Sequence, residues 1–252
     1  MPGWDRRRVA FGSSRFIFAT EDGVIAGWPG GTRAFVGVDN SATTGAVYKG
    51  LALAALNPDG TGQQLYATDF HNARVDVFDS AFGLVTLPGA FVDPRLPAGY
   101  APFGIQTLGD QVLVAYAKVD PATGDEEAAV GLGFVDAFDT DGGFMGRVAT
   151  RGHLNAPWGL AMAPDTFGRF KGDLLVGNFG DGQINAYRER PNGQFTHDGR
   201  LRMPGGKVLA IEGLWAIQVG NGAGSGSADS LYFTAGPDDE THGLLGRIDP
   251  AP

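Results

Sequence analysis

Residues 16–28 read FIFATEDGVIAGW, and this short stretch decides the fold of the chain. An apolar run leads into a polar tip, and a second run follows that ends in an aromatic residue. The arrangement returns at residues 65–78 as LYATDFHNARVDVF. Each copy predicts two antiparallel strands that are joined by a tight turn. The other copies lie at residues 113–116 with 133–138, at 174–187, and at 231–235 with 243–248.

The spacing of the copies predicts the architecture. They begin between 48 and 61 residues apart, and a four-stranded propeller blade takes about 40–50 residues. We therefore predict an all-β β-propeller with five recognisable blades in a single domain, residues 1–252. The two longer intervals predict insertions at residues 120–132 and 192–207, which are rich in Gly, Pro and charge. No segment shows a clean 3.6-residue period, so helix should be scarce.

A second element precedes four of the copies and predicts the inner strand of each blade. A Gly or a bulky residue is followed by Leu or Ile and then by small apolar residues, which let several backbones converge near the axis. The first copy lacks such a strand, and the last copy lacks an outer strand, so both end blades are predicted to be incomplete. The inner strands are predicted at residues 49–53, 103–106, 158–162 and 212–217, and the outer strands at 32–39, 84–90, 144–150 and 201–204.

The incomplete end blades lead to a prediction about assembly. Residues 8–11 supply a candidate outer strand for the last blade, which repairs only one of the two defects. An unpaired sheet edge invites pairing with another chain. The sequence therefore predicts self-association, most simply as a symmetric homodimer through the blade edges. The alternative is a monomer whose terminal segments cover both edges.

Composition excludes several classes of partner and chemistry. The formal net charge is −9, whereas nucleic-acid binders carry clustered Lys and Arg. No apolar stretch approaches the length of a membrane span, and the first residues contain no apolar region typical of a signal peptide. The chain has no cysteine, which excludes disulfides, thiol nucleophiles and cysteine-bound metals.

Candidate site residues occupy comparable places at the ends of the predicted strands. Loops in a propeller gather at the mouths of the central channel, so Glu21, His71, Asn178 and Glu212 are predicted to converge at one mouth. A carboxylate near the axis, as predicted for Glu212, needs a cation, a hydrogen-bond donor or a shifted pKa. The further candidates for binding a ligand or a metal are Tyr48, Lys49, Asp69, Phe103, Lys118, His153, Trp158, Asp181 and Trp215.

Several of these residues also have a structural interpretation. Asp181 lies between two glycines and is a typical hairpin-turn residue. His71 directly precedes Asn72, another turn former. Trp158 and Trp215 suit packing between neighbouring blades. The sequence leaves both interpretations open.

Specific motifs carry a resemblance over nearly the whole chain. They include FATEDG at residues 18–23, APWGL at 156–160, GNFGDG at 177–182, EGLWA at 212–216 and YFTAGP at 232–237. With them the chain resembles an uncharacterised bacterial and fungal family of predicted secreted β-propeller proteins and, more loosely, propellers of the NHL type. The resemblance implies a fuller pattern of six blades, of which this chain is an N-terminally shortened version, and an extracellular or periplasmic location. It implies no catalytic residues.

Two functions remain open at this point. The preferred hypothesis is a binding module that holds a polar small molecule, a sugar or a protein partner at the channel mouth. The alternative is a metal-dependent hydrolase that acts on esters or lactones. In such a hydrolase Glu21, Asp69, Asn178 and Glu212 would offer oxygen ligands to Ca²⁺, and His71 would act as general base. The sequence contains neither a Gly-x-Ser-x-Gly elbow nor a His-Glu-x-x-His motif. A purely structural or interaction role is the third possibility.

Overall fold

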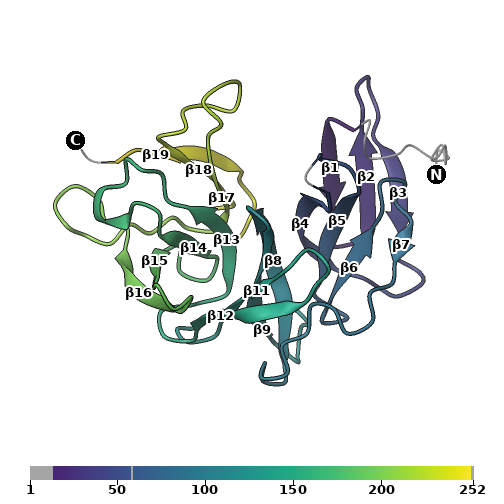
Figure 1. The fold of residues 1–252 in the computed structure, drawn as a ribbon, viewed down its shortest axis with the longest axis horizontal. Helices are drawn as coiled ribbons and strands as arrows, with labels where there is room; N and C mark the ends of the chain where they lie inside the picture. Colours follow the sequence, from purple (N-terminus) through teal and green to yellow (C-terminus); the bar gives the residue numbers. More distant parts are fainter. Residues whose placement is uncertain (1–13, 58, 251–252) are drawn as a thin grey trace. The chain divides into compact units, whose positions relative to one another are not determined.

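The computed structural model describes residues 14–57 and 59–250, and the regular secondary structure of these residues consists almost entirely of β-strands joined by turns and loops (Figure 1). The described residues include one short 3-10 helix, η2, at Gly168–Phe170. The strands form five successive antiparallel sheets, which are the blades of a β-propeller. The predicted all-β fold with five blades is confirmed.

The first two blades contain seven strands. These are β1 (Phe16–Ala19), β2 (Val24–Trp28), β3 (Phe35–Asp39), β4 (Tyr48–Ala55), β5 (Gln63–Asp69), β6 (Arg74–Phe78) and β7 (Leu84–Val85). The first sheet has the order β1-β2-β3 and the second has the order β4-β5-β6-β7. Each strand therefore pairs with its neighbour in the sequence, as expected for a sheet made of consecutive hairpins.

The other three blades are also built from antiparallel pairs, mostly of strands that are neighbours in the sequence. Their strands are β8 (Tyr100–Leu108), β9 (Gln111–Val119), β10 (Glu126–Glu127), β11 (Phe134–Phe138), β12 (Phe144–Thr150), β13 (Pro157–Met162), β14 (Leu174–Asn178), β15 (Ile184–Glu189), β16 (Phe195–Arg200), β17 (Leu214–Val219), β18 (Leu231–Ala235) and β19 (Leu244–Ile248). The third sheet has the order β10-β9-β11-β12, with β8 paired to β9. The fourth has the order β13-β14-β15-β16, and the fifth has the order β17-β18-β19.

The inner strands were predicted well and the outer strands less well. The outer strand of the fourth blade is β16 at Phe195–Arg200, so its predicted position at residues 201–204 was wrong. The strand also lies inside the predicted insertion at 192–207, which is therefore not a loop throughout. β7 covers only the first two residues of the predicted range 84–90. Outer strands face solvent on much of their surface, so they lack the apolar alternation that marks inner strands.

Both end blades have three strands among the described residues. Within residues 14–250, the first sheet has no strand before β1, which pairs with β2, and the last sheet has no strand after β19, which pairs with β18. The predicted incompleteness of these blades is confirmed for this part of the chain. The candidate strand at residues 8–11 lies outside the described residues. Self-association through the blade edges stays a prediction.

The chain divides into two compact units. The first comprises the residues up to Val112 together with Phe138–Phe144. Its core joins apolar side chains from the first two blades, and several of them, such as Ile25, Leu65 and Phe78, are almost completely buried. Burying a side chain of this size contributes about 1.5–3 kcal/mol.

The second unit comprises Leu113–Ala137 together with the residues from Met145 onward. Its core lies between the sheets of the fourth and fifth blades, and β13 and β17 are neighbouring inner strands. Leu175, Ile184 and Leu214 are fully buried in this core. The packing fixes the ends of β13, β14 and β17, where most of the predicted site residues of this unit lie.

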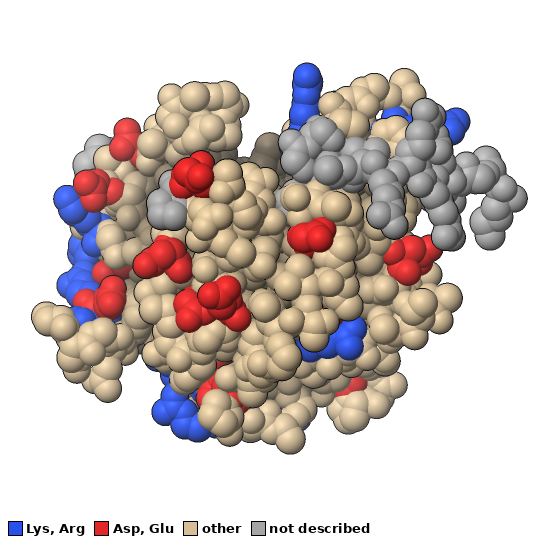
Figure 2. Space-filling view, turned by 45° about the vertical axis from the view of Figure 1, so that its right-hand side comes forward, with Lys and Arg blue, Asp and Glu red and all other residues tan. Residues whose placement is uncertain are grey.

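The surface carries charges of both signs. On the face shown in Figure 2, acidic side chains are spread over the surface, and basic side chains occur in separate groups, several of them near its edges. This distribution agrees with the formal net charge of −9. Within the described residues, no helix has the length and apolar character that crossing a membrane requires.

Candidate functional site

A β-bulge near the start of the inner strand recurs in three blades. At each bulge the inner strand has one residue more than the strand with which it pairs. Lys49, Trp158 and Trp215 lie at these positions. Bulges re-aim side chains and are common next to functional sites. Three residues that the sequence selected as ligand-binding candidates therefore share one backbone feature. The flanking register pairs are Tyr48–Asp69 and Gly50–Thr68 in β4–β5, Pro157–Asn178 and Gly159–Gly177 in β13–β14, and Leu214–Ala235 and Ile217–Phe233 in β17–β18.

In the first unit, Lys49 meets a carboxylate and two aromatic rings. Its Nζ atom lies 2.6 Å from Glu21 Oε1. The same Nζ atom is 6.0 Å from the ring centroid of Phe70 and 5.9 Å from that of Phe103. Aromatic faces attract a cation through their quadrupoles. The structure thus brings together three predicted residues, namely Glu21, Lys49 and Phe103.

Tyr48 and Asp69 are buried and serve the structure of the second blade. The Tyr48 hydroxyl donates to Asp76 Oδ2 at 2.9 Å and accepts from Asn40 Nδ2 at 2.8 Å. Asp69 accepts hydrogen bonds from two backbone N–H groups, both at 3.2 Å. Burial of the side chain raises the pKa of Tyr48 above its usual value. These contacts hold β4 to the neighbouring turns.

We expect the Tyr48→Phe substitution to lower the free energy of unfolding by about 1–3 kcal/mol. The substitution removes one donor from the buried Asp76 carboxylate and the acceptor of Asn40 Nδ2. Urea unfolding of the variant and of the unmodified chain measures the difference. Unchanged stability would contradict the structural role of this hydroxyl.

His71 and Lys118 belong to different units. His71 is exposed in the turn after β5, where a Cβ atom added to Gly45 would lie 3.9 Å from its Cδ2 atom. Lys118 belongs to β9 and stands opposite Glu127 of β10. The predicted convergence of Glu21 and His71 with Asn178 and Glu212 involves both units and stays a prediction.

In the second unit, the two bulge tryptophans face each other. The ring centroids of Trp158 and Trp215 are 6.4 Å apart in an edge-to-face arrangement, which is a favourable geometry for aromatic pairs. The Trp215 indole donates to Glu240 Oε1 at 2.7 Å. Glu212 is exposed, and its Oε1 accepts from the backbone N–H of Asp238 at 3.2 Å. The indole rings of Trp158 and Trp215 and the hydrogen-bonded carboxylates of Glu212 and Glu240 therefore lie near the start of β17.

The loop that carries Glu240 has an unusual backbone. Asp238, Asp239 and Glu240 have φ values of 55°, 49° and 62°, so three consecutive non-glycine residues are left-handed. This conformation costs about 1–2 kcal/mol for each such residue. Backbone strain of this kind concentrates at functional sites. The strained loop thus adds to the case for a site at this end of the second unit.

Asn178 is the most constrained polar residue of the second unit. It is fully buried at the end of β14, and its Nδ2 donates to His153 O at 2.8 Å and to Asp181 Oδ1 at 3.0 Å. These two acceptors fix the amide orientation, so Oδ1 points away from them. Neither Asn178 Oδ1 nor the buried Asn155 Oδ1 has a hydrogen-bond partner among the described residues. A buried acceptor without a donor costs about 1–3 kcal/mol.

Two histidines stack beside this amide network. The rings of His153 and His197 have centroids 4.5 Å apart, and His197 Nε2 lies 3.2 Å from Asn185 Oδ1. Burial, together with the nearby His153 and Arg200, lowers the pKa of His197. His153 was selected from the sequence, but His197 was missed because β16 was not expected at this position. A polar outer strand offers no sequence signal that would single it out.

The second-unit site is defined here as Asn155, Trp158, Asn178, Glu212, Trp215 and Glu240. Its parts lie at one end of two neighbouring inner strands, because Pro157 pairs with Asn178 and Gly159 packs against the backbone of Trp215. Among the described residues, no group of three or more His, Asp or Glu side chains is arranged to hold a metal ion. The side-chain oxygen atoms at this site come from two amides and two carboxylates.

Comparison with known proteins finds relatives of no assigned activity. No family model matches the chain. It is 36 % identical over 212 residues to the uncharacterised protein L690 of Acanthamoeba polyphaga mimivirus, covering 81 % of this chain and 51 % of that protein. It is 34 % identical over 207 residues to the uncharacterised protein R648 of the same virus, covering 80 % and 48 %. The chain spans about half the length of these curated relatives.

Solved structures share the fold. A protein named as a candidate gluconolactonase superimposes with a TM-score of 0.61 at 18 % identity, covering 94 % of this chain and 74 % of that protein. A gluconolactonase of Xanthomonas campestris superimposes with a TM-score of 0.57 at 19 % identity, covering 93 % and 72 %. The chain thus has gluconolactonase-like β-propeller neighbours in structure. At this level of identity the likeness concerns the fold.

Proposed function

We propose that this chain hydrolyses small lactones or related esters at the second-unit site, with a hard divalent cation such as Ca²⁺ as cofactor. The observation that carries the proposal is the buried Asn178 Oδ1, which has no hydrogen-bond partner among the described residues. A cation would satisfy this oxygen. The hydrolase hypothesis is thereby preferred to the binding module that the sequence alone favoured.

The oxygen atoms of the second-unit site are of the chemical types that bind such a cation. Ca²⁺ accepts amide and carboxylate oxygens and completes its shell with water. Asn178 and Asn155 would offer their Oδ1 atoms, which are both buried and have no hydrogen-bond donor within the described part of the chain. The carboxylate of Asp181 lies on the same turn as Asn178. Few carboxylates take part, so we expect modest affinity for the metal.

The chain's own residues would bind the substrate and move the proton. A bound cation polarises a carbonyl group and activates water. The paired rings of Trp158 and Trp215 would cover one side of a small ring substrate. The exposed Glu212 carboxylate, held by the Asp238 N–H, would accept a proton from the attacking water. Glu240 would keep the Trp215 indole in place.

The fold supports the proposed substrate class. Two structural neighbours are described as gluconolactonases, and both superimpose over more than nine-tenths of this chain. A fold alone does not determine an activity. The proposal therefore rests on the unpartnered amide oxygen, and the neighbours indicate which substrates should be tried first.

The decisive experiment combines metal analysis with a substrate panel. The purified chain is dialysed against a chelator and reloaded with Ca²⁺, Mg²⁺ or no metal, and hydrolysis of γ- and δ-lactones is followed by proton release above the uncatalysed rate. We expect turnover that requires Ca²⁺ and a calcium-dependent rise in melting temperature. No turnover with any lactone or metal would contradict the hydrolase.

The aromatic pair favours a second candidate function. Trp158 and Trp215 present ring edges and faces that would suit a sugar or a related polar ligand. A binding module would show heat of binding with sugars or aldonic acids in calorimetry but no hydrolysis in the lactone panel. Calorimetry and the lactone panel, both run on the same purified protein, therefore distinguish the two candidate functions.

A further inference from the structure

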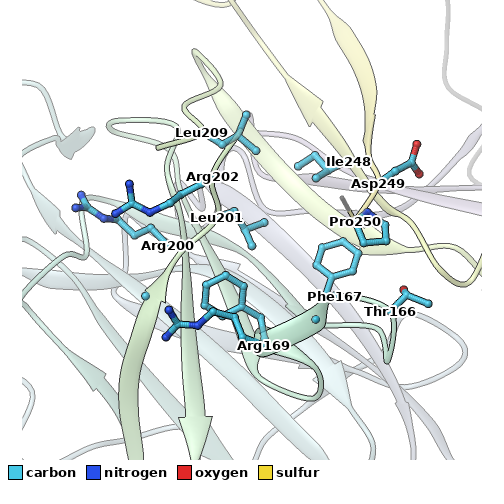
Figure 3. Close-up of a pocket in the computed structure, with 13 residues that line it drawn as sticks. Thr166, Phe167, Arg169, Arg200, Leu201, Arg202, Leu209, Ile248, Asp249 and Pro250 are labelled. Carbon is cyan, nitrogen blue, oxygen red and sulfur yellow. The ribbon is translucent and has the colours of Figure 1, made fainter. Parts of the chain in front are cut away.

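A cavity of the second unit is lined by residues other than those of the site described above. It has a volume of about 410 Å³ and lies between η2, the hairpin that follows β16, and the end of β19. Ligand pockets in proteins typically enclose about 300–1,000 Å³. Figure 3 shows the residues around this cavity. The cavity therefore has room for one small molecule.

The lining of the cavity is mainly apolar. Phe167 and Leu201 belong to the buried core cluster of the second unit, and Phe170, Leu209 and Ile248 pack against it. The floor of the cavity is thus formed by side chains of the hydrophobic core of the second unit. An apolar ligand body would remove this surface from water, which contributes roughly 25 cal/mol for each Å² of apolar area.

Three arginines border the same cavity. In Figure 3 the side chains of Arg169, Arg200 and Arg202 extend to one side of the apolar group, and Asp249 lies on the opposite side. Such an arrangement gives the cavity a cationic side. It stands out in a chain whose formal net charge is −9.

Two of these arginines have no carboxylate partner among the described residues. Arg200 donates to Gln183 Oε1 at 2.8 Å, and Arg202 donates to the backbone oxygen of Gly206 at 2.5 Å. Both acceptors are neutral, and a guanidinium has five N–H donors. Each of the two side chains therefore keeps a full charge and further donors for a ligand.

The neighbouring acidic groups are already compensated. Asp249 accepts from Ser230 Oγ at 2.6 Å and pairs with Arg247 at 2.9 Å. Asp198 pairs with Arg169 at 3.1 Å and with Arg188 at 2.7 Å. The charge that is left at the border of the cavity is positive and is centred on Arg200 and Arg202.

We propose that this cavity binds a small amphipathic carboxylate, with its apolar body against Phe167, Leu201 and Ile248 and its carboxylate on Arg200 and Arg202. Guanidinium groups bind carboxylates through charge-assisted, often paired hydrogen bonds. The combination of an apolar floor and a cationic border selects such a ligand over a neutral or a cationic one. The binding site is independent of the hydrolytic site and needs no metal.

The first arm of the test uses the unmodified chain. 1-Naphthoate and its neutral analogue 1-naphthamide are titrated into the protein by isothermal calorimetry in the presence of a chelator. We expect naphthoate to bind at least about tenfold more tightly than the amide, because the charged hydrogen bonds are lost with the amide. Equal affinities, or no binding of naphthoate up to its solubility limit, would overturn the proposal.

The second arm uses matched charge variants. Arg200→Gln and Arg202→Gln should each weaken naphthoate binding by about tenfold and leave the amide unaffected. Arg190→Gln is the control, because Arg190 is exposed in the same blade and contacts Thr196 rather than the cavity. An equal loss in the control would show a general charge effect and would refute the site. The first arm does not depend on the folding of any variant.

Discussion

Replacing Gly182 with alanine is expected to lower the free energy of unfolding by roughly 4 kcal/mol, a loss in the range that single substitutions seldom reach. Gly182 has a φ of +67°, where a Cβ atom is strained. The added Cβ would lie 1.9 Å from the backbone oxygen of Ile211. Because the Ile211 N–H donates to Gly182 O at 3.0 Å, this backbone cannot move away without losing that hydrogen bond. Urea unfolding followed by tryptophan fluorescence measures the loss.

Gly193→Ala is the matched control for this prediction. Gly193 belongs to the same blade and has a φ of +75°, but a Cβ atom there would meet no atom within 4 Å. We expect a loss of about 1–2 kcal/mol from the backbone conformation alone. If both variants lost the same stability, the contact between Gly182 and Ile211 would not be the cause.

The inner framework of each blade could be predicted because its sequence pattern follows from close packing. Gly50 and Gly159 each lie where a side chain would meet a neighbouring strand, so the Gly-Leu pattern marks inner strands reliably. β16 has no such signature: its sequence FTHDGR is mostly polar, and none of its residues is fully buried. Its position depends on pairing with β15, which the sequence of the strand itself does not encode.

The site could be predicted only in part, for a related reason. Comparable positions in the repeat singled out Lys49, Trp158 and Trp215, which all lie at bulges, and their role in binding stays a prediction. Whether a polar residue is already satisfied depends on distant partners. Tyr48 bonds with Asp76, and Asn178 bonds with the backbone of His153, 25 residues away in the sequence. Such contacts distinguish polar groups that are already hydrogen-bonded within the fold from groups that remain able to bind a ligand. They can be recognised only in the three-dimensional structure.

Asn178→Ala is expected to reduce calcium-dependent lactone hydrolysis by about 100-fold or more, since even an outer-shell change at a metal site costs 10- to 100-fold. The substitution removes the buried Oδ1 atom that we propose as a cation ligand. It also removes the donor to His153 O, so some loss of stability is expected as well. A second readout is therefore the rise in melting temperature on adding calcium, which reports binding to the folded state independently of the starting stability.

Asn178→Asp separates a ligand role from a structural role. Aspartate keeps an oxygen at this position but loses the amide donor to His153 O and faces the carboxylate of Asp181. If Asn178 is a cation ligand, this variant should be less stable without calcium and should show a larger calcium-induced rise in melting temperature than the unmodified chain. Asn192→Ala, in an exposed turn where the Asn192 side chain hydrogen-bonds to Gln194, should leave turnover and the calcium response unchanged. An aspartate variant that behaves like the alanine variant, with no calcium response, would mean that the amide of Asn178 only holds the turn together.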